Sequence, residues 1–174
     1  DCMVISNTSK NPERAMALWD LITNDQEVYD AFYYGIEGTS YDGALLGGYL
    51  LENTSQKPDV VLVASGSEVE LAVKVAKELR KKYQVNVVSM PSIEMFQKQP
   101  VGYKNKIISK DASLVLAIEA SNDTKWLKIL GEHGETFGVE EYMHSGAGEE
   151  VMAKAGFTVK NLVKFVETKL KSQK

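Results

Sequence analysis

The sequence predicts a three-layer α/β/α protein, built on a mostly parallel sheet of about five strands with one short antiparallel strand and preceded by a helical segment. An unbroken apolar run at residues 60–64 and mostly apolar runs at 85–90 and 113–120 are bounded by turn residues, which is typical of strands covered on both faces. Segments with helical spacing lie between these runs. Strands that alternate with helices predict a parallel sheet with helices on both faces.

The N-terminal segment is predicted to be helical. Asn11 is a suitable N-cap, and Pro12 fits the first helical position. The apolar stripe of this helix consists of Ala15, Leu18, Trp19 and Ile22. Asp25 can cap a second short helix, and a glycine-rich connection follows it. We therefore predict a helical segment with a linker over residues 1–41 and an α/β domain over residues 42–174.

Local signals predict the first half of the α/β domain in order. A short strand is expected at Gly48–Glu52, before the apolar run at residues 60–64. Ser67 and Glu70 match a capping box at the start of the next helix. The predicted buried face of that helix is Val69, Val73, Ala76 and Leu79. The strand at residues 85–90 then ends at a proline, which completes a βαβ unit.

The second half of the domain repeats the alternation. The strand at residues 113–120 precedes a helix at 123–130, for which Asp123 is the expected cap. A short strand at 136–139 and a short helix at 149–155 follow. Thr158 is expected to cap a last helix. The apolar positions of that last helix are Leu162, Val163, Val166 and Leu170.

Composition limits the classes of function. The chain has 174 residues, 44% of them hydrophobic, and a formal net charge of −4, so it is long enough to bury a real core. Its lysines are spread among glutamates, which argues against a nucleic-acid partner. No apolar run reaches the ~18 residues that a membrane span needs, so we expect no membrane partner. The single cysteine, Cys2, excludes an internal disulfide, and His133 and His144 are not at metal-ligand spacing.

The segment Ser65-Gly66-Ser67 joins a strand to a helix N-terminus, which is the usual geometry for binding a phosphate. Two carboxylates, Glu68 and Glu70, occupy the first helical turn and would repel an anion. The lysine or second glycine of phosphate-binding motifs is also missing. We therefore interpret this turn mainly as a helix start.

Glu119 ends a predicted buried strand, at the edge of the sheet where open α/β folds bind ligands. A carboxylate buried there needs hydrogen-bond partners, and we expect them to be nearby loop amides. The weak candidates for a cleft at the strand ends are Ser65, Gly66, Ser67 and Glu119. No catalytic, cofactor-binding or metal-binding residue is predicted, because no nucleophile elbow or paired base is present. Trp126, Tyr33 and Tyr34 are expected to pack in a core, with a subunit interface as the alternative.

Several motifs in one order resemble the C-terminal domain of transketolases. They are the linker EGTS, the strand GGY, the turn ASGSEV and the strand end VVSMPS, followed by YKNKII, AIEA and AGFTVKNLV. The resemblance covers residues 37–172. It implies the fold of that domain, in agreement with the elements predicted above.

The resemblance also implies a function for the parent enzyme. Transketolases use thiamine diphosphate and a divalent metal, Mg or Ca, to transfer a two-carbon ketol unit between phosphorylated sugars of the pentose phosphate pathway. Their two preceding domains hold these cofactors at a dimer interface. The resemblance therefore implies that this chain binds no cofactor itself and is inactive alone. Its expected partners are the other domains of a cytoplasmic homodimeric enzyme, whose folding and dimerisation it supports.

Two stretches depart from the family pattern. Family members carry an Arg-Gln-Asn stretch before the linker, whose arginine contacts the substrate's phosphate, whereas this chain has DAFYYGI at residues 30–36. His144-Ser145-Gly146-Ala147-Gly148 also replaces the family's proline-containing stretch. No arginine can therefore be assigned the phosphate contact in this chain.

Residues 3–41 resemble a different family. The stretch SNTSKNPERAMALWDLITNDQEVYDAFYYGIEGTSY is similar to the C-terminal helical tail of extracellular solute-binding proteins of sugar or oligopeptide importers. We favour a fusion or chimera of two protein tails over a single divergent transketolase. Two alternative functions stay open: a fragment of an importer's solute-binding protein, and a stand-alone regulatory or nucleotide-binding module that uses the Gly66 turn.

Overall fold

The computed structural model describes residues 12–25, 41–139, 146 and 148–172, and the chain divides into two compact units at residues 1–42 and 43–174. In the first unit, helix α1 spans Pro12–Asn24. Its Ile22 is buried, but Leu18, from the predicted apolar stripe, is 55% exposed. The helix predicted after Asp25 and the N-cap at Asn11 lie outside the described residues.

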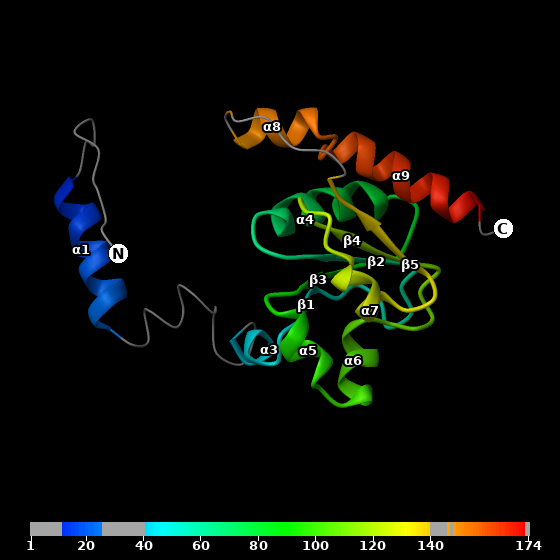
Figure 1. The fold of residues 1–174 in the computed structure, drawn as a ribbon, viewed down its shortest axis with the longest axis horizontal. Helices are drawn as coiled ribbons and strands as arrows, with labels where there is room; N and C mark the ends of the chain where they lie inside the picture. Colours follow the sequence, from blue (N-terminus) through cyan, green and yellow to red (C-terminus); the bar gives the residue numbers. More distant parts are fainter. Residues whose placement is uncertain (1–11, 26–40, 140–145, 147, 173–174) are drawn as a thin grey trace. The chain divides into compact units, whose positions relative to one another are not determined.

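The second unit contains a five-stranded sheet with the order β1-β3-β2-β4-β5. The strands are β1 (Tyr49–Glu52), β2 (Val60–Ala64), β3 (Val85–Ser89), β4 (Leu114–Ile118) and β5 (Gly134–Phe137). Figure 1 labels these strands. Among the described strands, only β1 is antiparallel to its neighbour, β3. The register of this pair is interrupted by an irregularity between Leu50 and Glu52. The predicted mixed sheet with one short antiparallel strand is confirmed. The last strand begins two residues earlier than predicted.

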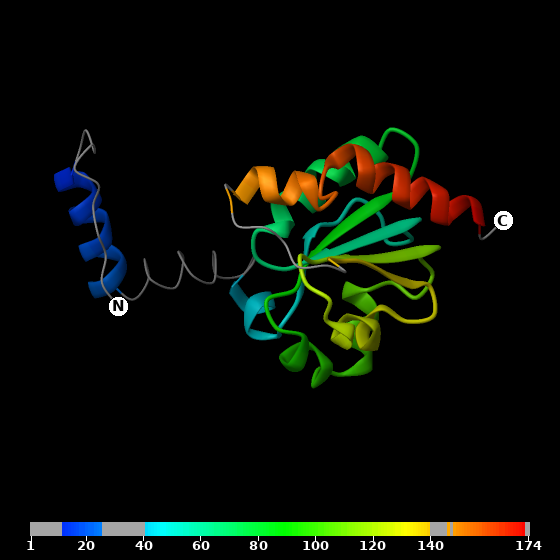
Figure 2. The same ribbon diagram turned by 45° about the horizontal axis from the view of Figure 1, so that its top comes forward.

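Helices cover both faces of the sheet, as Figure 2 shows. Helices α4 (Glu68–Leu79), α8 (Gly148–Lys154) and α9 (Val159–Ser172) lie on the first face. The second face carries α5 (Ile93–Gln97), α6 (Val101–Ile107), the 3₁₀ turn Thr124–Trp126 and α7 (Leu127–Leu130). Helix α3 (Tyr41–Leu45) precedes the sheet. The predicted three layers are therefore present.

A separate apolar core lies on each face. The first core packs side chains of β2, β3 and β4, including fully buried Leu62 and Leu116, against α4 and α9. The second core joins Val63 and Val88 to Phe96 and Trp126. Trp126 is only 4% exposed, so its predicted core packing is confirmed. Tyr33 and Tyr34 lie outside the described residues.

The buried face of α4 differs from the prediction. Its buried apolar residues are Ala72, Val75, Ala76 and Leu79. Val69 and Val73 only flank the core and remain half-buried. The small side chains of Ala72 and Ala76 allow close approach of α4 to the sheet, which the pattern of larger apolar residues does not reveal. The sequence also did not predict α5 and α6, which are too short to show a helical period.

Candidate functional site

Two of the four predicted cleft residues meet at the carboxyl edge of the sheet. Ser65 follows β2 and Glu119 follows β4, and these parallel strands pair through Ala64 and Ile118. The Ser65 hydroxyl donates a hydrogen bond to Glu119 Oε2 at 2.8 Å. The chain passes from β2 to β3 on one side and then returns past β2 to β4. This reversal makes a topological switch point, where open α/β sheets usually bind ligands.

The prediction of which group hydrogen-bonds the Glu119 carboxylate was wrong. We expected loop amides, but its carboxylate accepts a hydrogen bond from a hydroxyl on the adjacent strand end. The backbone explains part of this difference, because loop amides nearby already have other acceptors. The Glu119 amide donates to the Phe137 carbonyl, and the Val139 amide donates to the Ser121 carbonyl.

The predicted capping box at the Gly66 turn is also wrong. Ser67 already has helical backbone angles, φ −68° and ψ −26°, and its side chain makes no capping hydrogen bond. Its hydroxyl donates to Glu68 Oε2 at 3.1 Å instead. Glu70 forms an ion pair with Lys74 one turn later, at 2.6 Å. The Gly66 turn, with a φ of +50°, directs the Glu68 amide to the Ser65 carbonyl. Gly66 and Ser67 are exposed and contribute no side chain toward Glu119.

The carboxyl edge is acidic. Burial raises the pKa of Glu119 above its ordinary value, and the nearby carboxylates Glu68 and Asp123 raise this pKa further. The hydrogen bond from Ser65 acts in the opposite direction. Glu68 is itself buried, at 7% exposure. Such a concentration of negative charge disfavours a phosphate at the Gly66 turn.

The hollow beside Glu119 is small. It has a volume of about 100 Å³, which is below the roughly 300–1,000 Å³ typical of small-molecule sites. No lysine, arginine or histidine lines it among the described residues. Asp123 accepts a hydrogen bond from the Lys125 amide at 2.9 Å, which confirms its predicted capping role. A Cβ atom on Gly138 would lie 2.5 Å from the Ser121 carbonyl oxygen, so the two loops are tightly packed. This hollow therefore fits water or a single small group.

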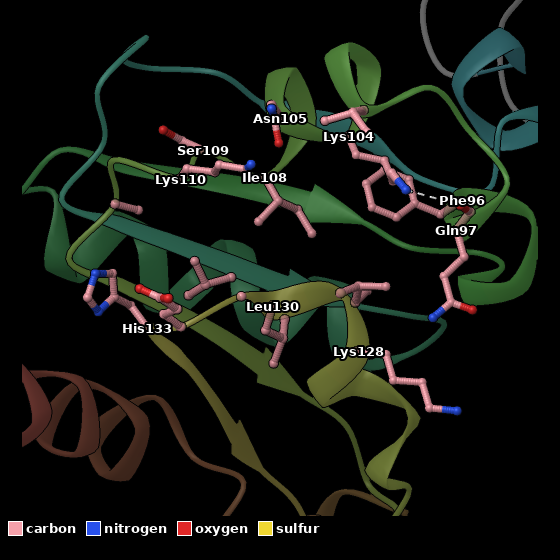
Figure 3. Close-up of a pocket in the computed structure, with 16 residues that line it drawn as sticks. Phe96, Gln97, Lys104, Asn105, Ile108, Ser109, Lys110, Lys128, Leu130 and His133 are labelled. Carbon is pink, nitrogen blue, oxygen red and sulfur yellow. Dashed lines mark hydrogen bonds between the residues drawn. The ribbon is translucent and has the colours of Figure 1, made fainter.

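A much larger cavity, of about 590 Å³, lies on the second face, near the amino edge of β4 and β5. Figure 3 shows Lys104, Asn105, Ile108, Ser109 and Lys110 along one wall, with Leu130 and His133 on the other. Sequence reasoning missed this cavity because its lining comes from several short segments that share no motif. The only sequence signal is the density of lysines around α6, which is weak by itself.

The histidines do not form a metal site within the described residues, where no group of three His, Cys, Asp or Glu side chains is placed to hold a metal ion. His133 is exposed in the loop before β5. His144 and Cys2 lie outside the described residues. No helix in the described part of the chain is long and apolar enough to cross a membrane.

Comparisons with known proteins agree with this fold. The family model described as the transketolase-like TK C-terminal domain matches residues 47–158. A probable transketolase of Streptococcus pneumoniae is 38% identical over 131 residues, covering 75% of this chain and 20% of the relative. The structure of transketolase from Leishmania mexicana has a TM-score of 0.69 and 32% identity, over 78% of this chain and 20% of that one.

A third similar protein was solved with a sugar phosphate. The Pichia stipitis transketolase in complex with sedoheptulose 7-phosphate has a TM-score of 0.69 and 31% identity, over 78% of this chain and 20% of that chain. This chain thus spans about a fifth of the length of its relatives. The matched part contains the five-stranded sheet and the helices that cover it, except α9, which begins at Val159. The chain therefore belongs to the transketolase family, in which it matches the C-terminal domain.

Proposed function

We propose that this chain serves as the non-catalytic C-terminal domain of a cytoplasmic transketolase-type enzyme of the pentose phosphate pathway. The single observation that carries the proposal is the family match over residues 47–158, in which the chain corresponds to about a fifth of each relative. The parent enzyme would transfer a two-carbon ketol unit between phosphorylated sugars. The sugar phosphate in the Pichia stipitis structure supports this substrate class.

We further propose that thiamine diphosphate and its divalent metal are held by other domains of the parent. The carboxyl edge does not fit a diphosphate, because Glu68, Glu119 and Asp123 surround the switch point. The described residues there provide a hydroxyl and carboxylates, which can position loops but do not neutralise a diphosphate. The role of this domain would then be to support folding and homodimerisation of the parent.

An activity assay with reconstitution tests this proposal. The full chain is mixed with thiamine diphosphate, Mg²⁺, sedoheptulose 7-phosphate and an aldose phosphate acceptor, and ketol transfer is measured. We expect no transfer and no heat of thiamine diphosphate binding by calorimetry. Co-expression with a Streptococcus pneumoniae transketolase that lacks its matched fifth should give a stable complex. Transfer by the chain alone, or failure to associate with that partner, would contradict the proposal.

The resemblance of residues 3–41 to an importer tail leads to a second, separate proposal: the chain joins two unrelated protein tails. Two observations support it. Residues 1–42 form their own compact unit, and the family match begins only at residue 47. Limited proteolysis followed by mass spectrometry provides the test. We expect residues 42–174 to survive intact after residues 1–36 are removed. Protection of the whole chain as one unit would contradict a two-part organisation.

A further inference from the structure

The cavity on the second face has the dimensions of a small-molecule site. Its volume of about 590 Å³ lies within the roughly 300–1,000 Å³ typical of such sites. Its lining comes from the end of α5, from α6, from the loop before β4 together with Val115 of β4, and from α7 together with the segment that joins it to β5. All of these segments belong to one compact unit, so the cavity is formed without any contribution from residues 1–42.

The floor of this cavity is apolar. Ile108, Val115 and Leu130 are buried side chains of the second core that also line the cavity. Ile129 is half-buried beside them, and Val101 is 61% exposed at the rim. An apolar group that entered the cavity would therefore displace water from side chains that cannot hydrogen-bond it.

The polar part of the lining is basic. Lys104, Lys110 and Lys128 line the cavity with a single carboxylate, Glu132, in a chain whose net charge is −4. Within the described residues, none of these lysines forms an ion pair. The Lys104 ammonium group donates a hydrogen bond to the Gln97 carbonyl at 3.2 Å, visible as the dashed line in Figure 3. Elsewhere on the same unit, lysines such as Lys169 pair with a carboxylate, here Glu135 at 2.7 Å.

We propose that this cavity binds a small organic anion, in which a phosphate or carboxylate group is attached to an apolar, ring-sized group. The lysines would contact the anion, and Ile108, Val115 and Ile129 would contact the apolar portion. The cavity lies at the amino edge of β4 and β5, away from Ser65 and Glu119. The proposal is independent of the enzymatic role proposed above, because it depends only on residues that this unit contributes.

Three probes separate the two parts of the proposed ligand: AMP carries a phosphate and an adenine ring joined by ribose, adenosine lacks the phosphate, and inorganic phosphate lacks the ring and the ribose. Binding is followed by NMR on the full chain with labelled methyl groups. We expect AMP to shift the methyl signals of Ile108, Ile129 and Leu130, and to bind at least tenfold more tightly than either adenosine or phosphate. The methyls of Val69, beside the Gly66 turn, should not move.

Charge-removing variants sharpen the test. Lys110→Gln and Lys128→Gln should each weaken AMP binding about two- to fivefold, since an exposed charge pair contributes modestly. Val101→Glu adds a negative charge at the exposed rim and should also weaken AMP binding without affecting folding. The matched control is Lys160→Gln on α9, an exposed lysine without an ion pair in the described residues, which should leave AMP affinity unchanged.

Several results would overturn the proposal. They are the absence of AMP binding, equal affinity for AMP and inorganic phosphate, shifts confined to the Gly66 turn, or equal loss of affinity in Lys160→Gln. The competing occupant of the cavity is the surface of another protein molecule, and sedimentation velocity tests for it by measuring self-association of the chain. If the chain self-associates and its dimer, rather than AMP, shifts the cavity methyls, the cavity is an interface and not a small-molecule site.

Discussion

The two ends of the parallel strands carry opposite chemistry. At the carboxyl edge, the Ser65–Glu119 hydrogen bond spans the switch point, and the hollow beside it measures about 100 Å³. Near the amino edge, a cavity of about 590 Å³ is lined by lysines over an apolar floor. The comparison teaches that topology shows where an open sheet can bind a ligand, whereas the side chains decide whether that place is suitable.

The largest expected effect is the loss of unfolding free energy when a buried leucine is truncated, and it should differ between the first core and the wall of the large cavity. Leu116→Ala removes a fully buried side chain from the first core and should lower the free energy of unfolding by about 2–5 kcal/mol. Leu130→Ala removes an equally large side chain that lines the large cavity, so it loses fewer packing contacts and should cost less. Urea denaturation of both variants measures the difference. A larger loss for Leu130→Ala would show that the cavity wall is as tightly packed as the core.

A smaller effect is expected at the carboxyl edge. Ser65→Ala removes the hydroxyl that donates to Glu119 and should cost about 1–2 kcal/mol of unfolding free energy. It should also raise the pKa of Glu119, because the hydrogen bond from Ser65 favours the ionised carboxylate. NMR titration of the Glu119 carboxyl carbon measures this pKa. Ser67→Ala is the matched control, since the Ser67 hydroxyl donates to Glu68 and not to Glu119, and a similar rise in that variant would contradict the assignment.

The smallest expected effect is a dependence of stability on pH. Because the pKa of Glu119 is raised above its ordinary value of 4.5, the folded chain binds more protons than the unfolded chain between these two values. The contribution of Glu119 to stability is therefore fully present below 4.5 and is lost as pH rises through the raised pKa. Glu119→Gln, which resembles the protonated form, should gain stability relative to the wild type as pH increases across this window.

The test uses the difference in unfolding free energy between the wild type and Glu119→Gln at each pH. Carboxylates with a lowered pKa, such as Glu70 beside Lys74 and Glu167 beside Lys82, contribute the opposite dependence on pH. They are present in both the wild type and Glu119→Gln, so they cancel. Urea denaturation from pH 4 to pH 7 gives the difference. A Glu119→Gln variant that loses stability relative to the wild type as pH rises would contradict the raised pKa.

Prediction from sequence succeeded where one physical signal dominates. The apolar runs placed β2 at Val60–Ala64 and β3 within one residue, because strands covered on both faces are mostly apolar; Asn86 and Ser89 are the buried polar residues of β3. Thr158 was correctly predicted as a cap: its hydroxyl accepts a hydrogen bond from the Asn161 amide at 3.3 Å. These features depend on residues close together in the sequence.

Prediction failed where tertiary contacts compete with local patterns. Ser67 and Glu70 match a capping box by spacing, but Ser67 adopts helical angles and Glu70 pairs with Lys74. The Ser65–Glu119 hydrogen bond joins residues 54 positions apart, so no local pattern could reveal the partner. The large cavity is still less visible, because its walls form only after four separate segments have packed on the sheet.

The short strand β1 has a consequence for the behaviour of the chain in solution. An edge strand presents unpaired backbone groups to which a strand of another molecule can add. β1 has only four residues, its register is broken between Leu50 and Glu52, and Glu52 carries a charge held by Arg80 at 2.6 Å. A short, irregular and charged edge gives an incoming strand little to pair with. This end of the sheet is therefore protected against intermolecular β-sheet aggregation.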